Sequence, residues 1–214
     1  SGDLLTVNVA SGSSSSVTST FGGKVNALSV DITGSGTIVF NDDVDTDELI
    51  DAGDATYTIA ANKKFIGSID TASSAEGTFN FAATTTDTTL VSGTVGDTQA
   101  VKAVTVAPAS GVTATFGGNY GAVTTTHSGA GTVAYSGTVG GLGEAADIDI
   151  SGGGTVTLAA TMGGSGASDV DNTSGSAGSG TLTMAAGIDL TGNIGATKSL
   201  LALNVNSAGT SAFT

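Results

Sequence analysis

Hydrophobic and polar residues alternate along most of this chain with a period of two. This alternation predicts β-strands with one buried face, and Gly, Asn, Asp and Ser separate the runs as turn residues do. Apolar residues do not recur at the three- and four-residue spacing of an amphipathic helix, so we expect an all-β fold. The clearest alternating runs are residues 5–9, 28–32, 101–106, 148–150 and 201–205.

A five-residue word recurs within this pattern. It consists of Gly-Thr followed by a short alternating run that ends in a large hydrophobic or aromatic residue. A repeat of this size predicts supersecondary units that cannot bury their own apolar faces and must stack on one another. The copies begin at Gly36, Gly77, Gly131, Gly154, Gly180 and Gly209.

The intervals between the large residues that end these units are close to one β-solenoid coil. They are 19 residues from Phe21 to Phe40, 19 from Phe116 to Tyr135, 23 to Leu158, 26 to Met184 and 29 to Phe213. We therefore predict one parallel β-solenoid over residues 1–214, right-handed by default and of about eight coils. It carries an acidic loop insertion at 41–54 and a Gly/Ser-rich insertion at 163–180. Antiparallel β-sandwich domains are the alternative, because alternation does not reveal strand direction.

The acidic charge of the chain argues against some classes of partner. The 214 residues include 19 acids but only 5 Lys and no Arg, which gives a net charge of −14. Nucleic acids and anionic membrane surfaces are poor partners for such a chain, because both bind clustered cations. The apolar runs are also too short for a membrane-spanning helix, so we expect no membrane insertion by this segment.

Candidate catalytic residues are few. The chain has no Cys and a single His, His127, which we interpret as an exposed strand-end residue. It contains no phosphate-binding GxxxxGK[ST] loop, and its one Gly-Ser-Gly step, 164–166, lies in a predicted insertion rather than before a helix. We therefore expect that the protein is not an enzyme.

The acidic segment 42–54 is the candidate metal site. Its acids fall at positions 1, 3, 5, 9 and 12 of an EF-hand-like loop, a spacing of oxygen ligands that suits Ca²⁺. Position 6, which is Gly in such loops, is Glu48, so a solvated acidic loop is the alternative. A weaker calcium candidate combines the glycines of 163–166 with Asp169. The predicted calcium ligands are Asp43, Asp45, Asp47, Asp51 and Asp54.

The two ends of the chain match each other. Residues 4–9, Leu-Leu-Thr-Val-Asn-Val, resemble residues 200–205, Leu-Leu-Ala-Leu-Asn-Val, and neither end has a polar capping repeat. Open solenoid ends expose unpaired strand edges, so we expect either stacking of copies end to end or a longer repeat array. The predicted assembly interface consists of Leu4, Leu5, Val7, Val9, Leu201, Leu203, Val205 and Phe213.

The repeats also resemble those of known surface proteins. The word Gly-Asn-Ile-Gly at 192–195, followed by a Leu-Asn-Val strand and a Gly-Thr…Phe strand, is similar to repeats of large bacterial surface proteins. These include autotransporter passenger domains, among them the rickettsial outer-membrane-protein type, and repeat-rich surface-layer or adhesin proteins. The resemblance implies a parallel β-solenoid, an extracellular or cell-surface location, and a structural or adhesive role. We expect the repeating subunit of a filament or surface lattice, with an adhesin or passenger fragment as the alternative.

Overall fold

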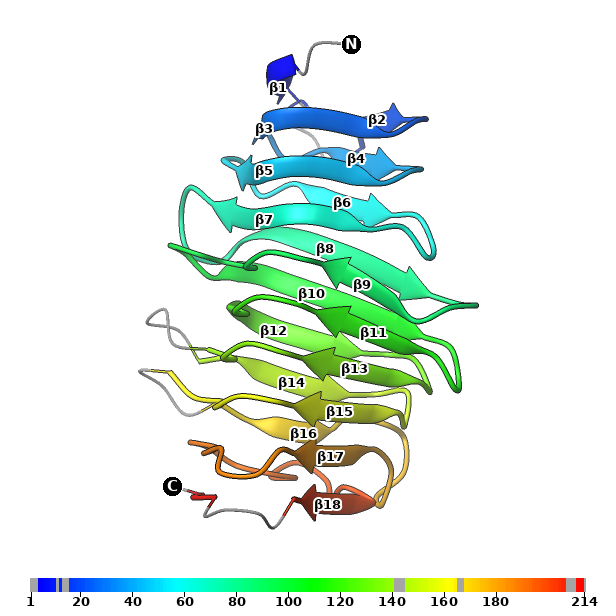
Figure 1. Cartoon of the computed structure of the whole chain (residues 1–214), viewed down its shortest axis with the longest axis vertical. Helices are drawn as coiled ribbons and strands as arrows, with labels where there is room; N and C mark the ends of the chain where they lie inside the picture. Colours follow the sequence, from blue (N-terminus) through cyan, green and yellow to red (C-terminus); the bar gives the residue numbers. More distant parts are fainter. Residues whose placement is uncertain are drawn as a thin grey trace.

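The chain folds into a parallel β-solenoid. The computed structural model describes residues 4–10, 12, 16–140, 145–164, 168–206 and 211–213. Within these residues there are eighteen β-strands and no helix, and every strand pairing is parallel. The strands stack in about nine turns with the two termini at opposite ends (Figure 1). The predicted fold class is confirmed, and the antiparallel alternative is wrong.

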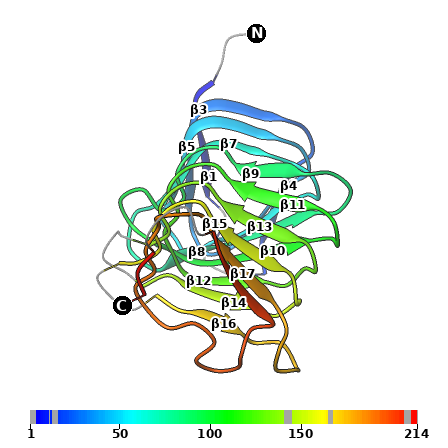
Figure 2. The same cartoon turned by 60° about the horizontal axis from the view of Figure 1, so that its bottom comes forward.

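Successive strands alternate between two sheets, so that each turn contributes one strand to each sheet until the last turn, where β17 and β18 share a sheet. Figure 2 shows the two sheets closing around a common interior. The ten-stranded sheet contains, in spatial order, β1 (Leu4–Ala10), β3 (Val25–Thr33), β5 (Val44–Asp51), β7 (Phe65–Thr71), β9 (Thr88–Val91), β11 (Thr113–Phe116), β13 (Thr132–Tyr135), β15 (Thr155–Leu158), β17 (Thr181–Met184) and β18 (Ala202–Val205). The eight-stranded sheet contains β2 (Thr18–Phe21), β4 (Thr37–Phe40), β6 (Thr56–Ile59), β8 (Glu76–Ala83), β10 (Val101–Pro108), β12 (Ala122–His127), β14 (Asp147–Ile150) and β16 (Val170–Asn172).

The core consists of the inward-facing side chains of the strands, which alternate with outward-facing side chains along each strand. Strands such as β4, β13 and β17 share the burial pattern that alternates partly exposed and buried positions. Aromatic rings stack between adjacent turns, with 4.3 Å between the ring centroids of Tyr57 and Phe79 and 5.4 Å between those of Phe116 and Tyr135. Such stacking adds to the area buried by each ring and favours the observed register.

Most predicted intervals between turns are correct. Phe21 pairs with Phe40, and the register runs from Phe116 through Tyr135 and Leu158 to Met184 as predicted. The last interval is wrong, because Met184 pairs with Val205 rather than with Phe213. Phe213 instead extends a third, narrower line of parallel bridges, which we call the corner ladder. It consists of Ile69, Val95, Tyr120, Val139, Met162, Leu190 and Phe213.

The Gly-Thr word does not mark one sheet. It forms β4 and β8 in the eight-stranded sheet, whereas its later copies form β13, β15 and β17 in the ten-stranded sheet. The longer strands change sheet in the same region. In the first turns the ten-stranded sheet has them, since β3, β5 and β7 are longer than β4 and β6. Further along, the eight-stranded sheet has them, since β8 and β10 are longer than β9 and β11. The word therefore specifies a strand beside a glycine, whichever sheet that strand joins, and the strand is short in every copy named here except β8.

Both predicted insertions contain solenoid strands. The acidic segment 41–54 includes β5, which pairs with β3 on one side and β7 on the other. The prediction of a loop there is wrong, because the inward positions Val44, Thr46 and Leu49 are buried and supply the alternation that the acids obscure. The segment 163–180 includes β16, which pairs with β14, while residues 165–167 lie outside the described residues.

Candidate functional site

The N-terminal end of the solenoid is an open strand edge. Strand β1 pairs with β3 on one side and with no described strand on the other. Its Val7 and Val9 lie beside the fully buried Val30 and Ile32 and pack partly buried against the core. The side chains of Leu4 and Leu5 lie outside the described residues. Within the described residues, this end therefore presents an inward-facing apolar row that no other strand covers.

The C-terminal end is an open edge of the same sheet. Strand β18 pairs only with β17 among the described strands. Leu203 and Val205 continue inward columns, because they pair with the buried Leu182 and Met184. They are nevertheless 44% and 39% exposed, since no further strand among the described residues covers them.

Exposed hydrophobic side chains concentrate at this end. Of the seven large ones in the described residues, four lie between residues 201 and 213. They are Leu201 (70% exposed), Leu203, Val205 and Phe213 (47%). Of the predicted interface residues with described side chains, Val7 and Val9 lie in β1 and Leu203 and Val205 in β18, the two edge strands that Figure 1 shows at opposite poles of the stack, whereas Phe213 lies in the corner ladder.

Lysines of other turns pair with three of the seven acids in the acidic segment 42–54. These ion pairs have distances of 2.6–2.8 Å between the lysine Nζ and a carboxylate oxygen, and they are Lys63–Asp42, Lys24–Asp45 and Lys102–Asp54. Asp43 accepts a hydrogen bond from the backbone N–H of Lys64. No three acidic or histidine side chains in the described residues gather into a group that could hold a metal ion. The weaker candidate, Asp169, accepts hydrogen bonds from the N–H groups of Asn193.

Calcium binding at the five predicted ligands stays a prediction. The segment is a strand, so their side chains are spread along it rather than wrapped round a central point. Of the five, Asp47 is exposed and Asp51 is buried in the core, while the other three make the contacts described above. A bound cation must therefore compete with the lysine partners of Asp45 and Asp54.

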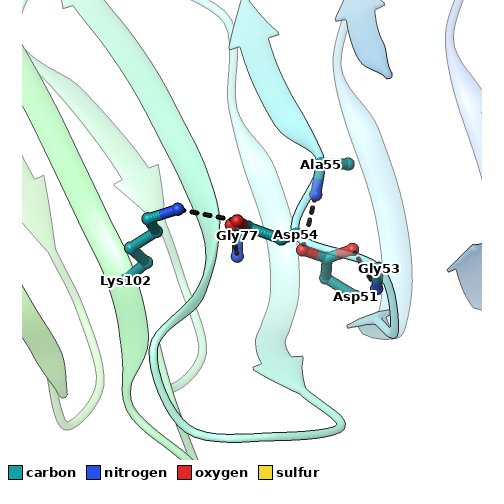
Figure 3. A network of polar contacts seen from close by, with 6 residues as sticks. All are labelled: Asp51, Gly53, Asp54, Ala55, Gly77 and Lys102. Atoms are coloured by element: carbon teal, nitrogen blue, oxygen red, sulfur yellow. Dashed lines mark hydrogen bonds and ion pairs between the residues drawn. The ribbon is translucent and has the colours of Figure 1, made fainter. Parts of the chain in front are cut away.

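Asp51 is a buried carboxylate at the corner between β5 and β6 (Figure 3). Its Oδ1 accepts the N–H of Gly53 at 3.2 Å, and its Oδ2 accepts the N–H of Ala55 at 3.1 Å. Burial raises the pKa of Asp51 to about 6. Gly77 of the next turn approaches closely: a Cβ there would lie 2.9 Å from the Asp51 carboxylate, and its φ is +73°. The corner therefore requires both the carboxylate and a glycine.

Eight other carboxylates connect neighbouring turns, and we call them the corner carboxylates. Each accepts a hydrogen bond from a backbone N–H that lies 21 to 29 residues later in the chain. In the described residues, every carboxylate that accepts a backbone N–H of another turn points in this direction. They are Asp43, Asp54, Asp70, Asp87, Asp147, Asp169, Asp171 and Asp189.

Asp70 is the most elaborate corner carboxylate. It is 5% exposed and accepts the N–H groups of Thr71, Thr98 and Gln99, and the Thr98 hydroxyl also donates to it. These bonds fasten the turn before β10 to β7. The acidity of the chain thus has a structural use that composition alone did not reveal.

The interpretation of His127 as an exposed residue is wrong. His127 is fully buried and faces inward from β12 between Val106 and Ile150. Neither Nδ1 nor Nε2 has a hydrogen-bond partner in the described residues. Burial lowers the pKa of His127 to about 4, so the ring is neutral at pH 7. Its strand position is inward because the alternation of β12 continues through it.

Comparisons with protein-family models, with curated proteins and with solved structures found no match. Among the described residues, no helix is long and apolar enough to cross a membrane.

Proposed function

We propose that this chain is a structural, extracellular protein segment whose β-ladder continues beyond β1 and β18 into further copies of the same chain. The supporting observation is that the two terminal strands belong to the same sheet and present matching inward columns. An open edge of backbone N–H and C=O groups pairs readily with another strand. The extracellular setting is supported by the resemblance of the repeats to those of bacterial surface proteins.

We propose a register for this contact from the match between the two ends. Placing β18 of one copy on β1 of the next puts Leu203 beside Val7 and Val205 beside Val9, all inward, with Asn204 beside Asn8 on the outside. Both asparagines are exposed. The contact is parallel and head to tail, as are the pairings inside the solenoid.

Disulfide cross-linking tests this register, because the chain contains no Cys. Adjacent strands lie about 4.8 Å apart, a Cα separation that a disulfide spans. The double variant Asn8→Cys/Asn204→Cys should form covalent oligomers on mild oxidation. The matched control, Thr6→Cys/Asn204→Cys, is displaced by two residues along β1 and should not cross-link, because its Cα atoms would be about 8 Å apart.

Electron microscopy of the unmodified chain provides the second readout. Uniform fibres together with the cross-link support the proposal, and fibres without it mean that copies join in another register. Isolated short rods at all concentrations overturn self-assembly. Rods would favour the alternative, a segment of a longer adhesin or passenger array, which the mass of the native protein tests directly.

A further inference from the structure

One outer face of the solenoid is a regular array of threonines. It comprises two outward positions, in register with one another, on each of six adjacent strands in the eight-stranded sheet, and we call it the threonine face. Nine of these twelve positions are Thr. One column contains Thr18, Thr37, Thr56, Thr78, Ala103 and Thr124, and the other contains Thr20, Val39, Thr58, Asn80, Thr105 and Thr126.

The register of this array is unbroken. None of the five pairings that build it, from β2 to β12, has a register shift, whereas the ten-stranded sheet has shifts between β5 and β7 and between β9 and β11. Adjacent rows are therefore separated by about 4.8 Å, and the two columns by about 6.7 Å, the distance spanned by two residues along a strand. The backbone thus holds the side chains in a rectangular lattice.

Strand propensity alone does not explain this arrangement. The outward positions of β3, β5 and β7 carry Ser, Ile and several acids instead, among them Asp31, Asp45 and Glu48. At its C-terminal side the threonine face ends where Thr124 and Thr126 pair with Asp147 and Asp149. The twelve positions of the threonine face are therefore free of the acids that occupy outward positions of β3, β5 and β14.

The threonine hydroxyls are available to a ligand. None of the nine has a side-chain hydrogen bond within the part of the chain that the structure describes. The twelve positions include no charged residue and no aromatic residue. Each Thr presents a methyl group and a hydroxyl, so the face offers alternating apolar and hydrogen-bonding points at fixed spacing.

We infer that the threonine face binds the surface of crystalline ice. Its spacings of about 4.8 Å and about 6.7 Å are each within about a tenth of the two repeats of the prism face of hexagonal ice. A neutral lattice of hydrogen-bonding oxygens suits an uncharged face whose hydroxyls are unpartnered. A crystalline polysaccharide fits less well, because sugar rings are generally bound by stacking on aromatic side chains and this face has none.

A second, smaller face has the same composition. Seven of the eight outward positions of β11, β13, β15 and β17 are Thr, again with no register shift between these strands. The positions are Thr113, Thr115, Thr132, Ala134, Thr155, Thr157, Thr181 and Thr183. A test must therefore disrupt both faces.

Ice-crystal growth in a nanolitre osmometer provides the test. The unmodified chain should shape ice into facets and separate its freezing point from its melting point. Thr58→Lys, in the larger face, should reduce this gap, and Thr58→Lys/Thr157→Lys should abolish it. The control Leu28→Lys adds the same charge at an exposed position of β3 and should leave the gap unchanged.

Circular dichroism of each variant separates loss of binding from loss of fold. Failure of the unmodified, folded chain to shape ice overturns the inference, as does an equal effect of Leu28→Lys and the double variant. Adsorption to powdered cellulose or chitin without ice shaping would identify a different ligand and also overturn it. The test is independent of assembly at the solenoid ends, since it can be run on monomers.

Discussion

Acidification should change the stability of this protein through two buried groups that act in opposite directions. His127 has its pKa lowered from 6.5 to about 4 by burial. Between these values the unfolded chain binds a proton that the folded chain does not, so His127 makes the folded state less stable as the pH falls from about 6.5 to about 4. This lowering of the pKa corresponds to about 3 kcal/mol.

Asp51 has the opposite sign. Burial raises its pKa from 3.8 to about 6, so the folded chain binds the extra proton in this window. Its contribution makes the folded state more stable as the pH falls from about 6 to about 4, again by about 3 kcal/mol. The two effects cancel to within about 1 kcal/mol, and the unmodified chain should show little net dependence on pH from these groups.

Urea unfolding at pH 7 and pH 4 separates the two effects. His127→Leu removes the imidazole that takes up a proton when the chain unfolds. Relative to the unmodified chain, the free energy of unfolding of this variant should therefore rise by about 3 kcal/mol between pH 7 and pH 4. Asp51→Asn should show a fall of similar size over the same range. Parallel pH profiles for His127→Leu and the unmodified chain would refute the assignment of His127 as a buried, unpartnered base.

Two further predictions concern the contacts between turns. Asp70→Ala should cost about 3 kcal/mol in urea unfolding, because it leaves the N–H groups of Thr98 and Gln99 without their acceptor, whereas the exposed Asp47→Ala should change stability by less than about 0.5 kcal/mol. Gly67→Ala should cost at least about 3 kcal/mol or prevent folding, because φ is +127° and a Cβ would lie 1.6 Å from the carbonyl oxygen of Thr46. Gly22→Ala, where a Cβ meets nothing within 4 Å, is its control and should be nearly neutral; equal melting temperatures for the two glycine variants would contradict the packing described here.

The sequence was sufficient to predict the solenoid because one coil leaves a visible trace: a large inward residue recurs at the interval of one turn. Phe21, Phe40, Phe116 and Tyr135 were paired correctly on this basis. The acidic strand β5 was missed because charge at outward positions resembles a loop when only composition is considered. Its inward residues, such as Val44 and Leu49, carried the correct signal.

The candidate sites were only partly predictable. The open ends could be recognised, because residues 4–9 and 200–205 are alike in sequence. The ion pair between Lys102 and Asp54 could not, because it joins residues 48 positions apart across two turns of unequal length. The burial of His127 could not be predicted either, because the sequence of a strand as short as β12 does not show whether its last side chain points inward or outward. The pairing of His127 with Val106 and Ile150, which are both buried, shows that it points inward.

The corner carboxylates give the molecule a preferred order of construction. In all eight, the acceptor belongs to the earlier turn and the N–H donor to the later one. A chain that emerges N-terminus first, as from a ribosome, therefore places each acceptor before the donor that needs it. Every completed turn is a template on which the next can dock without waiting for distant sequence. In the reverse order each N–H donor would be in place before its carboxylate acceptor, so these contacts favour folding in the direction of synthesis.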